Sequence, residues 1–220
     1  MKFITYSLLI ILVATSISVK AQQAPFYDEI QDFKKQDSIH PPPQHAILFV
    51  GSSSFRKWTD VQSYFPSYPI INRGFGGSSL PDVIHYANDI IFPYHPKEII
   101  IYCGENDFAA DSTVNADTVF NRFKTLYGMI RTQMKTVPVA FISIKPSPSR
   151  RKYWKKMIEA NILIRNYMAG EANTSFIDVF NPMLNDNSQP KPEIFESDSL
   201  HMNAKGYAIW QKAIEPYLIK

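Results

Sequence analysis

Four polar side chains of this sequence have the types and the placement that nucleophilic hydrolysis needs. Ser53 and Asn106 each follow an apolar run that ends in glycine, while Asp198 and His201 precede the last amphipathic stretch. A serine that attacks a carbonyl needs a general base, an acid that orients the base, and hydrogen-bond donors for the developing oxyanion. The sequence holds a candidate for each role, although a serine after a glycine is at least as often only a helix cap.

The segment Asp198-Ser199-Leu200-His201 supplies the candidate base and its partner. At this spacing a turn can bring the carboxylate of Asp198 to the Nδ1–H of His201, which leaves Nε2 to take the proton of a serine. A histidine here, taken alone, more often flanks a helix at the surface. The paired aspartate and the polar blocks upstream favour a catalytic pair instead.

The glycine-rich loop 73–79 and Asn106 are the candidate oxyanion donors. Backbone N–H groups around Gly77 are accessible because glycines carry no side chains, and Asn106 adds an amide donor. Asn106 and Asp107 are also common turn residues, and Asp107 could brace the site without acting in it. The loop lacks the third glycine of a dinucleotide fingerprint and no Gly-Lys-Ser/Thr follows, which argues against a nucleotide site.

Short apolar runs alternate with amphipathic segments, a pattern typical of a parallel sheet with helices on both faces. Strands are predicted at residues 46–50, 69–72, 98–103, 137–144 and 175–179, and helices at 53–58, 81–91, 114–135, 152–169 and 203–218. In the helix at 152–169, Ile158 is expected to face the core. Open α/β sheets place their sites at the carboxyl ends of the strands, so the candidate residues should converge there.

The first 21 residues have the pattern of a secretory signal peptide. Lys2 precedes an apolar stretch, and the small residues Val19 and Ala21 fit a cut before Gln22. An uncleaved membrane anchor is the alternative, but the apolar core is short and polar residues interrupt it. Residues 22–45 are expected to form a lead-in segment with a short amphipathic helix, and residues 46–220 a single domain. The protein is therefore expected to be secreted or periplasmic.

The composition is that of a globular protein, with 20% charged and 45% hydrophobic residues. The net charge is near zero once the leader is removed, so the charge demands no nucleic acid partner. Cys103 is the only cysteine and lies in an apolar run, which predicts a buried thiol and excludes an internal disulfide. The histidines at positions 40, 45, 85 and 95 show no metal-ligand spacing.

A basic cluster lies between residues 145 and 156. Acidic residues are absent from between its members, which are Lys145, Arg150, Arg151, Lys152, Lys155 and Lys156. A run of this kind is usually a solvated face of the protein. The alternative is a surface near the site that contacts an anionic polysaccharide or a lipid headgroup.

Four blocks of the sequence resemble, in order, those of the SGNH (GDSL-like) hydrolase family of esterases and lipases. The blocks are Gly51-Ser52-Ser53-Ser54, Gly74-Phe75-Gly76-Gly77, Gly104-Glu105-Asn106-Asp107 and Asp198-Ser199-Leu200-His201. They cover nearly the whole chain after the leader. The resemblance implies a flavodoxin-like three-layer α/β/α sandwich with a five-stranded parallel sheet, and it implies neither a metal nor a cofactor.

The resemblance also implies a role for each matching residue. Ser53 would be the nucleophile, His201 the base and Asp198 its partner. Gly77 and Asn106 would be oxyanion donors, together with the backbone N–H of Ser53.

The first block departs from the family pattern at one position. The aspartate that follows its glycine in the family is Ser52 here, so the block is GSSS. In the family that aspartate is regarded as structural, so the chemistry is expected to survive. Because three serines stand in a row, Ser52 and Ser54 remain alternatives to Ser53 as the nucleophile.

These features predict a secreted serine esterase that removes short acyl groups, such as acetyl, from carbohydrate. Its expected partner is a small-molecule or carbohydrate ester, with no stable membrane insertion after signal cleavage. A non-catalytic glycan-binding module is the alternative from another class, because fold does not fix function. An acyltransferase that uses the same acyl-enzyme is a third hypothesis, which the residues alone do not separate from hydrolysis.

Overall fold

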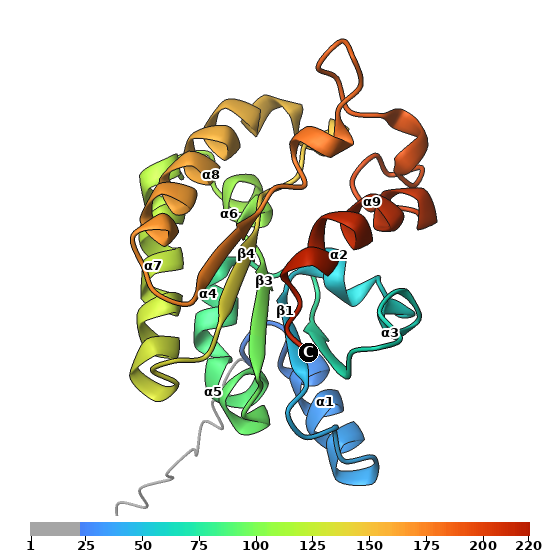
Figure 1. The fold of residues 1–220 in the computed structure, drawn as a ribbon. Helices are drawn as coiled ribbons and strands as arrows, with labels where there is room; N and C mark the ends of the chain where they lie inside the picture. The colour runs from blue at the N-terminus through green and yellow to red at the C-terminus, as the bar shows by residue number, and fades with distance from the viewer. Residues whose placement is uncertain (1–22) are drawn as a thin grey trace, which may run out of the picture.

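Five parallel strands form the centre of the computed structural model, which describes residues 23–220 (Figure 1). Their order in the sheet is β2-β1-β3-β4-β5, the doubly wound order in which β2 is added on one side of β1 and the later strands are added on the other. The strands are β1 (Ile47–Gly51), β2 (Ile70–Gly74), β3 (Glu98–Tyr102), β4 (Val139–Ile142) and β5 (Thr174–Ile177). All five predicted strands are thereby confirmed. The predicted signal peptide lies outside the described residues.

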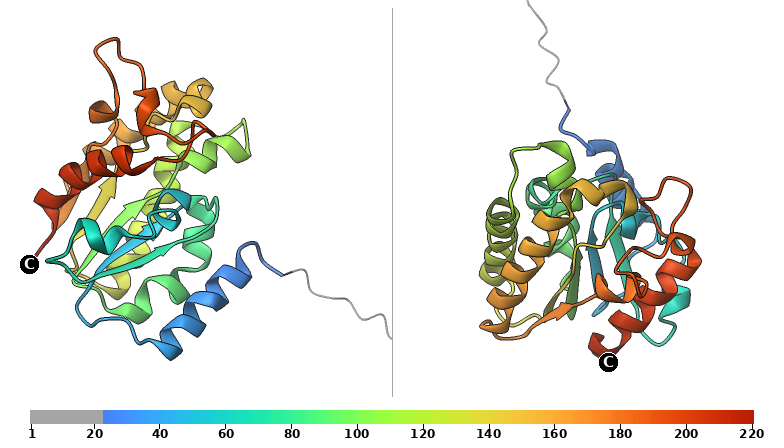
Figure 2. Two further views of the ribbon diagram at one scale, coloured as in Figure 1. Left: turned by 90° about the vertical axis from the view of Figure 1, so that its right-hand side faces the viewer. Right: turned by 90° about the horizontal axis from the view of Figure 1, so that it is seen from above.

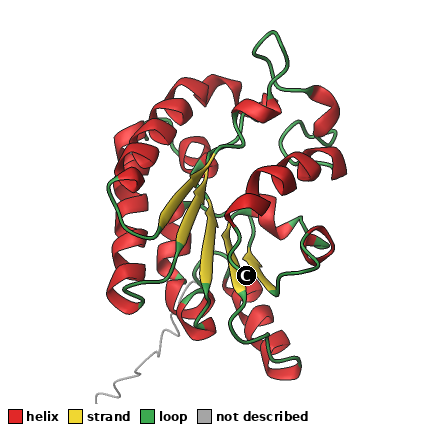
Figure 3. Cartoon of the chain, viewed as in Figure 1, coloured by secondary structure: helices red, strands yellow, loops and turns green. Residues whose placement is uncertain are grey.

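Helices cover both faces of the sheet, as the red helices around the yellow strands show (Figure 3). One layer consists of α4 (Leu80–His85), α5 (Ala87–Ile90), α7 (Ala116–Gln133) and α8 (Trp154–Ala169), with α1 (Tyr27–Ile39) beside it. The other consists of α2 (Ser53–Arg56), α3 (Val61–Tyr64) and α9 (Ala204–Ile214). Seen from above, α7 and α8 lie on one side of the strands and α9 on the other (Figure 2). The predicted α/β/α sandwich is confirmed.

The pattern of β1 explains this layering. Successive side chains of a strand point to opposite faces, so Leu48 and Val50 pack into the core under α4, α5, α7 and α8. Ile47 and Phe49 pack into the core under α2 and α9. All four are fully buried, because a central parallel strand is covered on both sides.

The helices differ from the prediction in three places, one of which is the short helix α3, which was not predicted. The segment predicted as one helix over 81–91 is divided into α4 and α5 at Tyr86, which ends one helix and begins the next. The helix α6 (Glu105–Ala110) was not predicted, because its first residues are also good turn formers. It begins after Gly104, whose φ of +117° is readily adopted by glycine and strained for other residues.

The lead-in helix α1 is joined to the sheet by buried polar contacts. Arg73 of β2 is only 8% exposed and forms an ion pair with Asp37 of α1. The hydroxyl of Tyr94 donates to Asp37 at 2.6 Å and accepts from Nε of Arg73 at 2.6 Å. Burial, followed by the bond to Asp37, raises the pKa of Tyr94 to about 12. The hydroxyl therefore stays protonated and keeps this bond across the ordinary pH range.

Across residues 23–220, none of the helices combines the length and the apolar character that crossing a bilayer requires.

Glu98 begins β3 and carries a buried carboxylate, 3% exposed, that accepts the N–H of Ile219 at 3.0 Å. Burial raises its pKa from 4.5 to about 7, which the N–H bond and Lys97 oppose only in part. The folded protein therefore holds this proton at pH values where the unfolded chain has lost it. Its contribution to stability is complete at low pH and is lost as the pH rises through about 7.

When the pH is raised from about 5 to about 8, we expect the free energy of unfolding to fall less in the variant Glu98→Gln than in the parent. The parent should lose on the order of 2–3 kcal/mol through this group, whereas the amide does not ionise and still accepts the Ile219 N–H. Urea unfolding of both proteins at the two pH values measures the difference. Equal pH dependence in parent and variant would contradict the assignment.

Candidate active site

Ser53, His201 and Asp198 form one continuous line of hydrogen bonds. His201 Nε2 lies 2.9 Å from Ser53 Oγ, and His201 Nδ1 lies 2.6 Å from Asp198 Oδ2. The carboxylate can only accept, so Nδ1 carries the proton and Nε2 is left to accept the Ser53 hydroxyl. Of the three consecutive serines, Ser53 is the one whose Oγ meets the imidazole. Ser52 and Ser54 are buried, at 3% and 1% exposed.

A tight turn at the end of β1 places Ser53. Gly51 has a φ of +143°, and a Cβ on it would lie 1.9 Å from the carbonyl oxygen of Tyr102 on β3. The chain then enters α2, whose first residue is Ser53. Asn72 of β2 holds this short helix, because its Nδ2 donates to the carbonyl oxygen of Phe55 at 2.7 Å.

The Asp198–His201 turn is held by its own backbone. Asp198 Oδ1 accepts the N–H groups of Leu200 and His201, both at 2.9 Å, while Oδ2 takes the imidazole. Desolvation alone would raise the pKa of Asp198, but these bonds outweigh it and hold the pKa well below its usual range. The Glu196 N–H also donates to the carbonyl oxygen of His201 at 2.8 Å. Asp198 is therefore an anion wherever the protein is folded near neutral pH.

The candidate oxyanion donors lie together at the ends of β2 and β3. A Cβ built on Gly77 would have a single neighbour within 4 Å, Nδ2 of Asn106 at 3.9 Å. That amide donates one hydrogen to the carbonyl oxygen of Ser78 at 3.2 Å, and its second is available. Among the described residues, the N–H groups of Gly77 and Ser53 have no acceptor.

Contacts with the ends of β1 and β3 hold the glycine loop, which itself follows β2. The carbonyl oxygen of Gly51 accepts the Phe75 N–H at 3.1 Å and the Ser78 hydroxyl at 3.2 Å. Asp107 accepts the N–H of Leu80 at 3.0 Å and pairs with Arg122 of α7 at 2.7 Å. Burial raises the pKa of Asp107, although these two partners oppose it. Asp107 thus braces the loop. This is one of the two roles that the sequence suggested for it, the other being that of a turn residue.

The basic cluster does not form a single solvated face, because Lys145 is buried. It is 1% exposed and forms an ion pair with Glu105, whose Oε2 also accepts the Tyr102 hydroxyl at 3.0 Å. Burial lowers the pKa of Lys145, and Glu105 opposes this shift. This pair was not predicted from the sequence. Its signal was the acidic residue Glu105 directly after the glycine that ends an apolar run, although nothing local indicated its partner.

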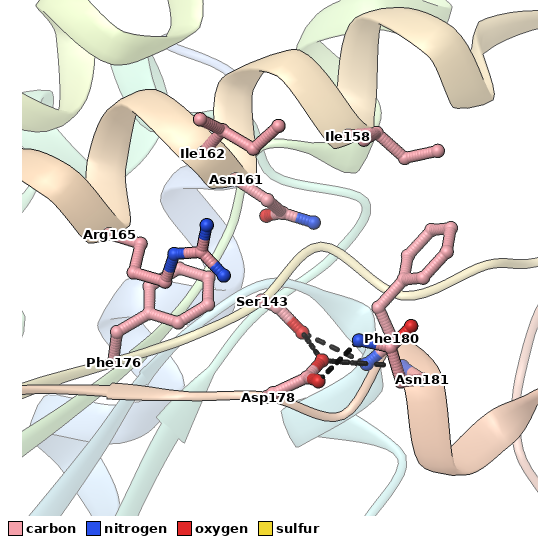
Figure 4. A pocket seen from close by; sticks show the side chains of 9 residues that line it. All are labelled: Ser143, Ile158, Asn161, Ile162, Arg165, Phe176, Asp178, Phe180 and Asn181. Atoms are coloured by element: carbon pink, nitrogen blue, oxygen red, sulfur yellow. Dashed lines mark hydrogen bonds between the residues drawn. The ribbon is translucent and has the colours of Figure 1, made fainter.

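A cavity of about 280 Å³ lies near the carboxyl ends of β4 and β5 (Figure 4), and its lining does not include Ser53, His201 or Asp198. Ile158, expected in the core, is instead 40% exposed at its edge, because it lies on the outer side of α8. Several polar groups of the cavity already have hydrogen-bond partners. Ser143 Oγ accepts the N–H groups of Val179 and Phe180, and Asp178 accepts the Phe180 N–H. The cavity is lined by Ser143, Ile158, Asn161, Ile162, Arg165, Phe176, Asp178, Phe180 and Asn181.

The doubly wound sheet, with its polar residues gathered at the strand ends, is the architecture of an SGNH-type hydrolase. The chain belongs to the GDSL-like Lipase/Acylhydrolase family, whose model matches residues 47–209. This confirms the resemblance of the four sequence blocks. No curated protein matches the chain.

Solved structures share the fold at low sequence identity. A protein from Streptococcus pneumonia, provisionally described as a platelet activating factor, is 21% identical with a TM-score of 0.76, covering 87% of this chain and 92% of its own. A GDSL-like lipase from Bacteroides thetaiotaomicron is 20% identical with a TM-score of 0.73, covering 85% and 95%. A mutant of an acetyl-xylooligosaccharide esterase from Geobacillus Stearmophilus is 15% identical with a TM-score of 0.63, covering 80% and 94%.

We expect Lys145→Met to lower the free energy of unfolding by about 3–5 kcal/mol, because it leaves the Glu105 carboxylate buried without its counter-charge. The double variant Lys145→Met/Glu105→Gln should recover most of this loss, since its amide is neutral and still accepts the Tyr102 hydroxyl. Urea unfolding checks both. Lys152→Met is the matched control, because that exposed lysine should change stability by less than about 0.5 kcal/mol. Equal effects of the two single variants would show that burial of Lys145 is not the cause.

Proposed function

We propose that the protein is a secreted serine esterase that hydrolyses carboxylic esters through an acyl-enzyme. The observation that carries this proposal is the line of hydrogen bonds from Asp198 through His201 to Ser53. Ser53 follows β1, and Gly77 and Asn106 follow the two strands that pair with β1. A glycan-binding module has no need of such a line. Membership of an acylhydrolase family supports the same chemistry.

The proposed reaction begins when Ser53 Oγ attacks the ester carbonyl and His201 Nε2 takes its proton. The negative charge of the tetrahedral intermediate falls on the carbonyl oxygen, where the N–H groups of Ser53, Gly77 and Asn106 can donate to it. His201 then protonates the leaving alcohol, and an acyl group remains on Ser53. A water activated by His201 releases the acid. Asp198 stabilises the imidazolium in both steps and keeps the ring in one tautomer.

The surroundings of the site favour a short acyl group on a polar alcohol. An open hollow of about 580 Å³ adjoins Asp198 and is lined mostly by charged and polar residues, which are Arg56, Lys57, Thr59, Glu196, Ser197 and Asp198, with Met202. An alkyl chain would gain little burial there, whereas hydroxyl groups of a sugar would find partners. An esterase of similar fold acts on acetyl-xylooligosaccharides, which is consistent with this class of substrate.

The proposed cellular location of the protein rests on its sequence alone. We propose export from the cytoplasm because residues 1–21 have the pattern of a signal peptide. Transfer of the acyl group to a sugar hydroxyl would use the same residues. Product analysis with and without a sugar acceptor separates an acyltransferase from an esterase.

We expect Ser53→Ala and His201→Ala each to lower kcat/KM for p-nitrophenyl acetate at least about 10³-fold. The first variant removes the nucleophile that attacks the carbonyl carbon, and the second removes the base that takes and returns its proton. Ser52→Ala and Ser54→Ala are the controls and should keep most of the activity. Circular dichroism verifies folding. A folded parent without activity, or an active Ser53→Ala, would contradict the proposed mechanism.

We expect p-nitrophenyl acetate to be hydrolysed with a kcat/KM at least about tenfold above that of the dodecanoate ester, since the hollow beside Asp198 offers little apolar surface to a long chain. Initial rates with a series of acyl lengths measure this preference. A kcat/KM that stays constant or rises with chain length would contradict the short-acyl proposal.

A further inference from the structure

Glu29 of the lead-in helix α1 reaches two segments of the active site. Its Oε2 accepts the N–H of Gly76 at 3.0 Å, next to the candidate oxyanion donor Gly77. The same oxygen pairs with Nε of Arg56 at 2.8 Å, and Arg56 is the last residue of α2, the helix that begins with Ser53. One carboxylate therefore joins the glycine loop to the helix of the proposed nucleophile.

The residue before α1 contacts the same loop. A Cβ built on Gly76 would lie 2.2 Å from a ring carbon of Phe26, and the φ of Gly76 is +32°. The Phe26 ring also packs edge-on against Phe75, with ring centroids 5.4 Å apart. The Tyr86 hydroxyl donates to the carbonyl oxygen of Pro25 at 2.7 Å and so fixes this end of the segment.

We propose that Glu29 is a positioning residue for the oxyanion donor Gly77, an inference that rests on the proposed esterase function. Two consecutive glycines have the widest choice of backbone conformation, so Gly77 N–H has no intrinsic reason to point at the substrate. Donors accelerate a reaction when their direction is set before the charge develops. Glu29 sets it by holding the N–H of Gly76, one peptide away.

Glu29 lies outside residues 47–209, the part of the chain that the family model matches. The helix α1 is nevertheless bound to β2 by the Asp37–Arg73 pair, so the carboxylate is held on a fixed element. Its side chain is 30% exposed. Loss of this carboxylate is therefore expected to affect the rate more than the stability.

The test compares Glu29→Ala with Asp28→Ala. Both residues lie in the first turn of α1 and carry the same charge, but Asp28 has no hydrogen bond or ion pair among the described residues. With p-nitrophenyl acetate, we expect Glu29→Ala to lower kcat roughly 10- to 100-fold with KM within about twofold. We expect Asp28→Ala to match the parent in kcat and KM. The melting temperatures of the two variants should lie within a few degrees of each other.

Two further variants separate the contacts of Glu29. Glu29→Gln keeps an oxygen that accepts the Gly76 N–H, so it should retain most of the parental kcat. Arg56→Met removes the ion pair and leaves the bond to Gly76, so the Gly76 amide should keep its parental protection from hydrogen exchange, a readout that does not depend on binding in the hollow that Arg56 lines. If Glu29→Ala equals Asp28→Ala in kcat, or if Glu29→Gln falls as far as Glu29→Ala, the proposal is overturned.

Amide hydrogen exchange gives a readout that does not depend on activity. Glu29→Ala should speed exchange at Gly76 at least about tenfold, while exchange in the strand β1 stays unchanged. Unchanged protection at Gly76 would overturn the proposal. A failure of the esterase proposal is seen separately, as an inactive parent or an active Ser53→Ala.

Discussion

The carboxyl end of β1 is packed so closely against β3 that its last residue has to be glycine. A Cβ on Gly51 would lie 1.9 Å from the carbonyl oxygen of Tyr102, and the residue's φ of +143° is itself a glycine conformation. Its own carbonyl oxygen accepts from the Phe75 N–H and the Ser78 hydroxyl. This single backbone position therefore sets both the direction in which the chain leaves toward Ser53 and the position of the glycine loop.

Behind this edge, the short helix α6 connects loops that are distant in sequence. Glu105 pairs with Lys145 after β4, and Asp107 pairs with Arg122 of α7 and holds the loop before α4. Burial disfavours the charged forms of Lys145 and Asp107, as the directions of their pKa shifts show. Buried ion pairs add little net stability compared with apolar packing, but they tolerate few alternative arrangements. We interpret these two ion pairs as fixing the position of Asn106, which lies between Glu105 and Asp107 in the sequence.

Local patterns were sufficient to predict the strands and the polar residues at their ends. Apolar runs and the Asp198–His201 spacing are properties of short segments, so they can be read without tertiary contacts. The burial of Lys145 and the contact of Glu29 with Gly76 were missed, because each depends on segments about 40 or more residues apart. The helix α6 was also missed, because its first residues are turn formers and its Asp107 bonds to Leu80, 27 residues away.

The proposed donors and the proposed base come from separate parts of the chain. Ser53, Gly77 and Asn106 follow three adjacent strands, whereas Asp198 and His201 lie on one turn held by its own backbone bonds. Within residues 23–220, the catalytic contact between the two parts is the bond between Ser53 Oγ and the imidazole of His201. In evolutionary terms the site is modular, because a change confined to residues 198–201 could abolish turnover and leave the ester-binding half intact. Under the proposed function, substitutions confined to Asp198 and His201 would convert the hydrolase into a receptor for its former substrate.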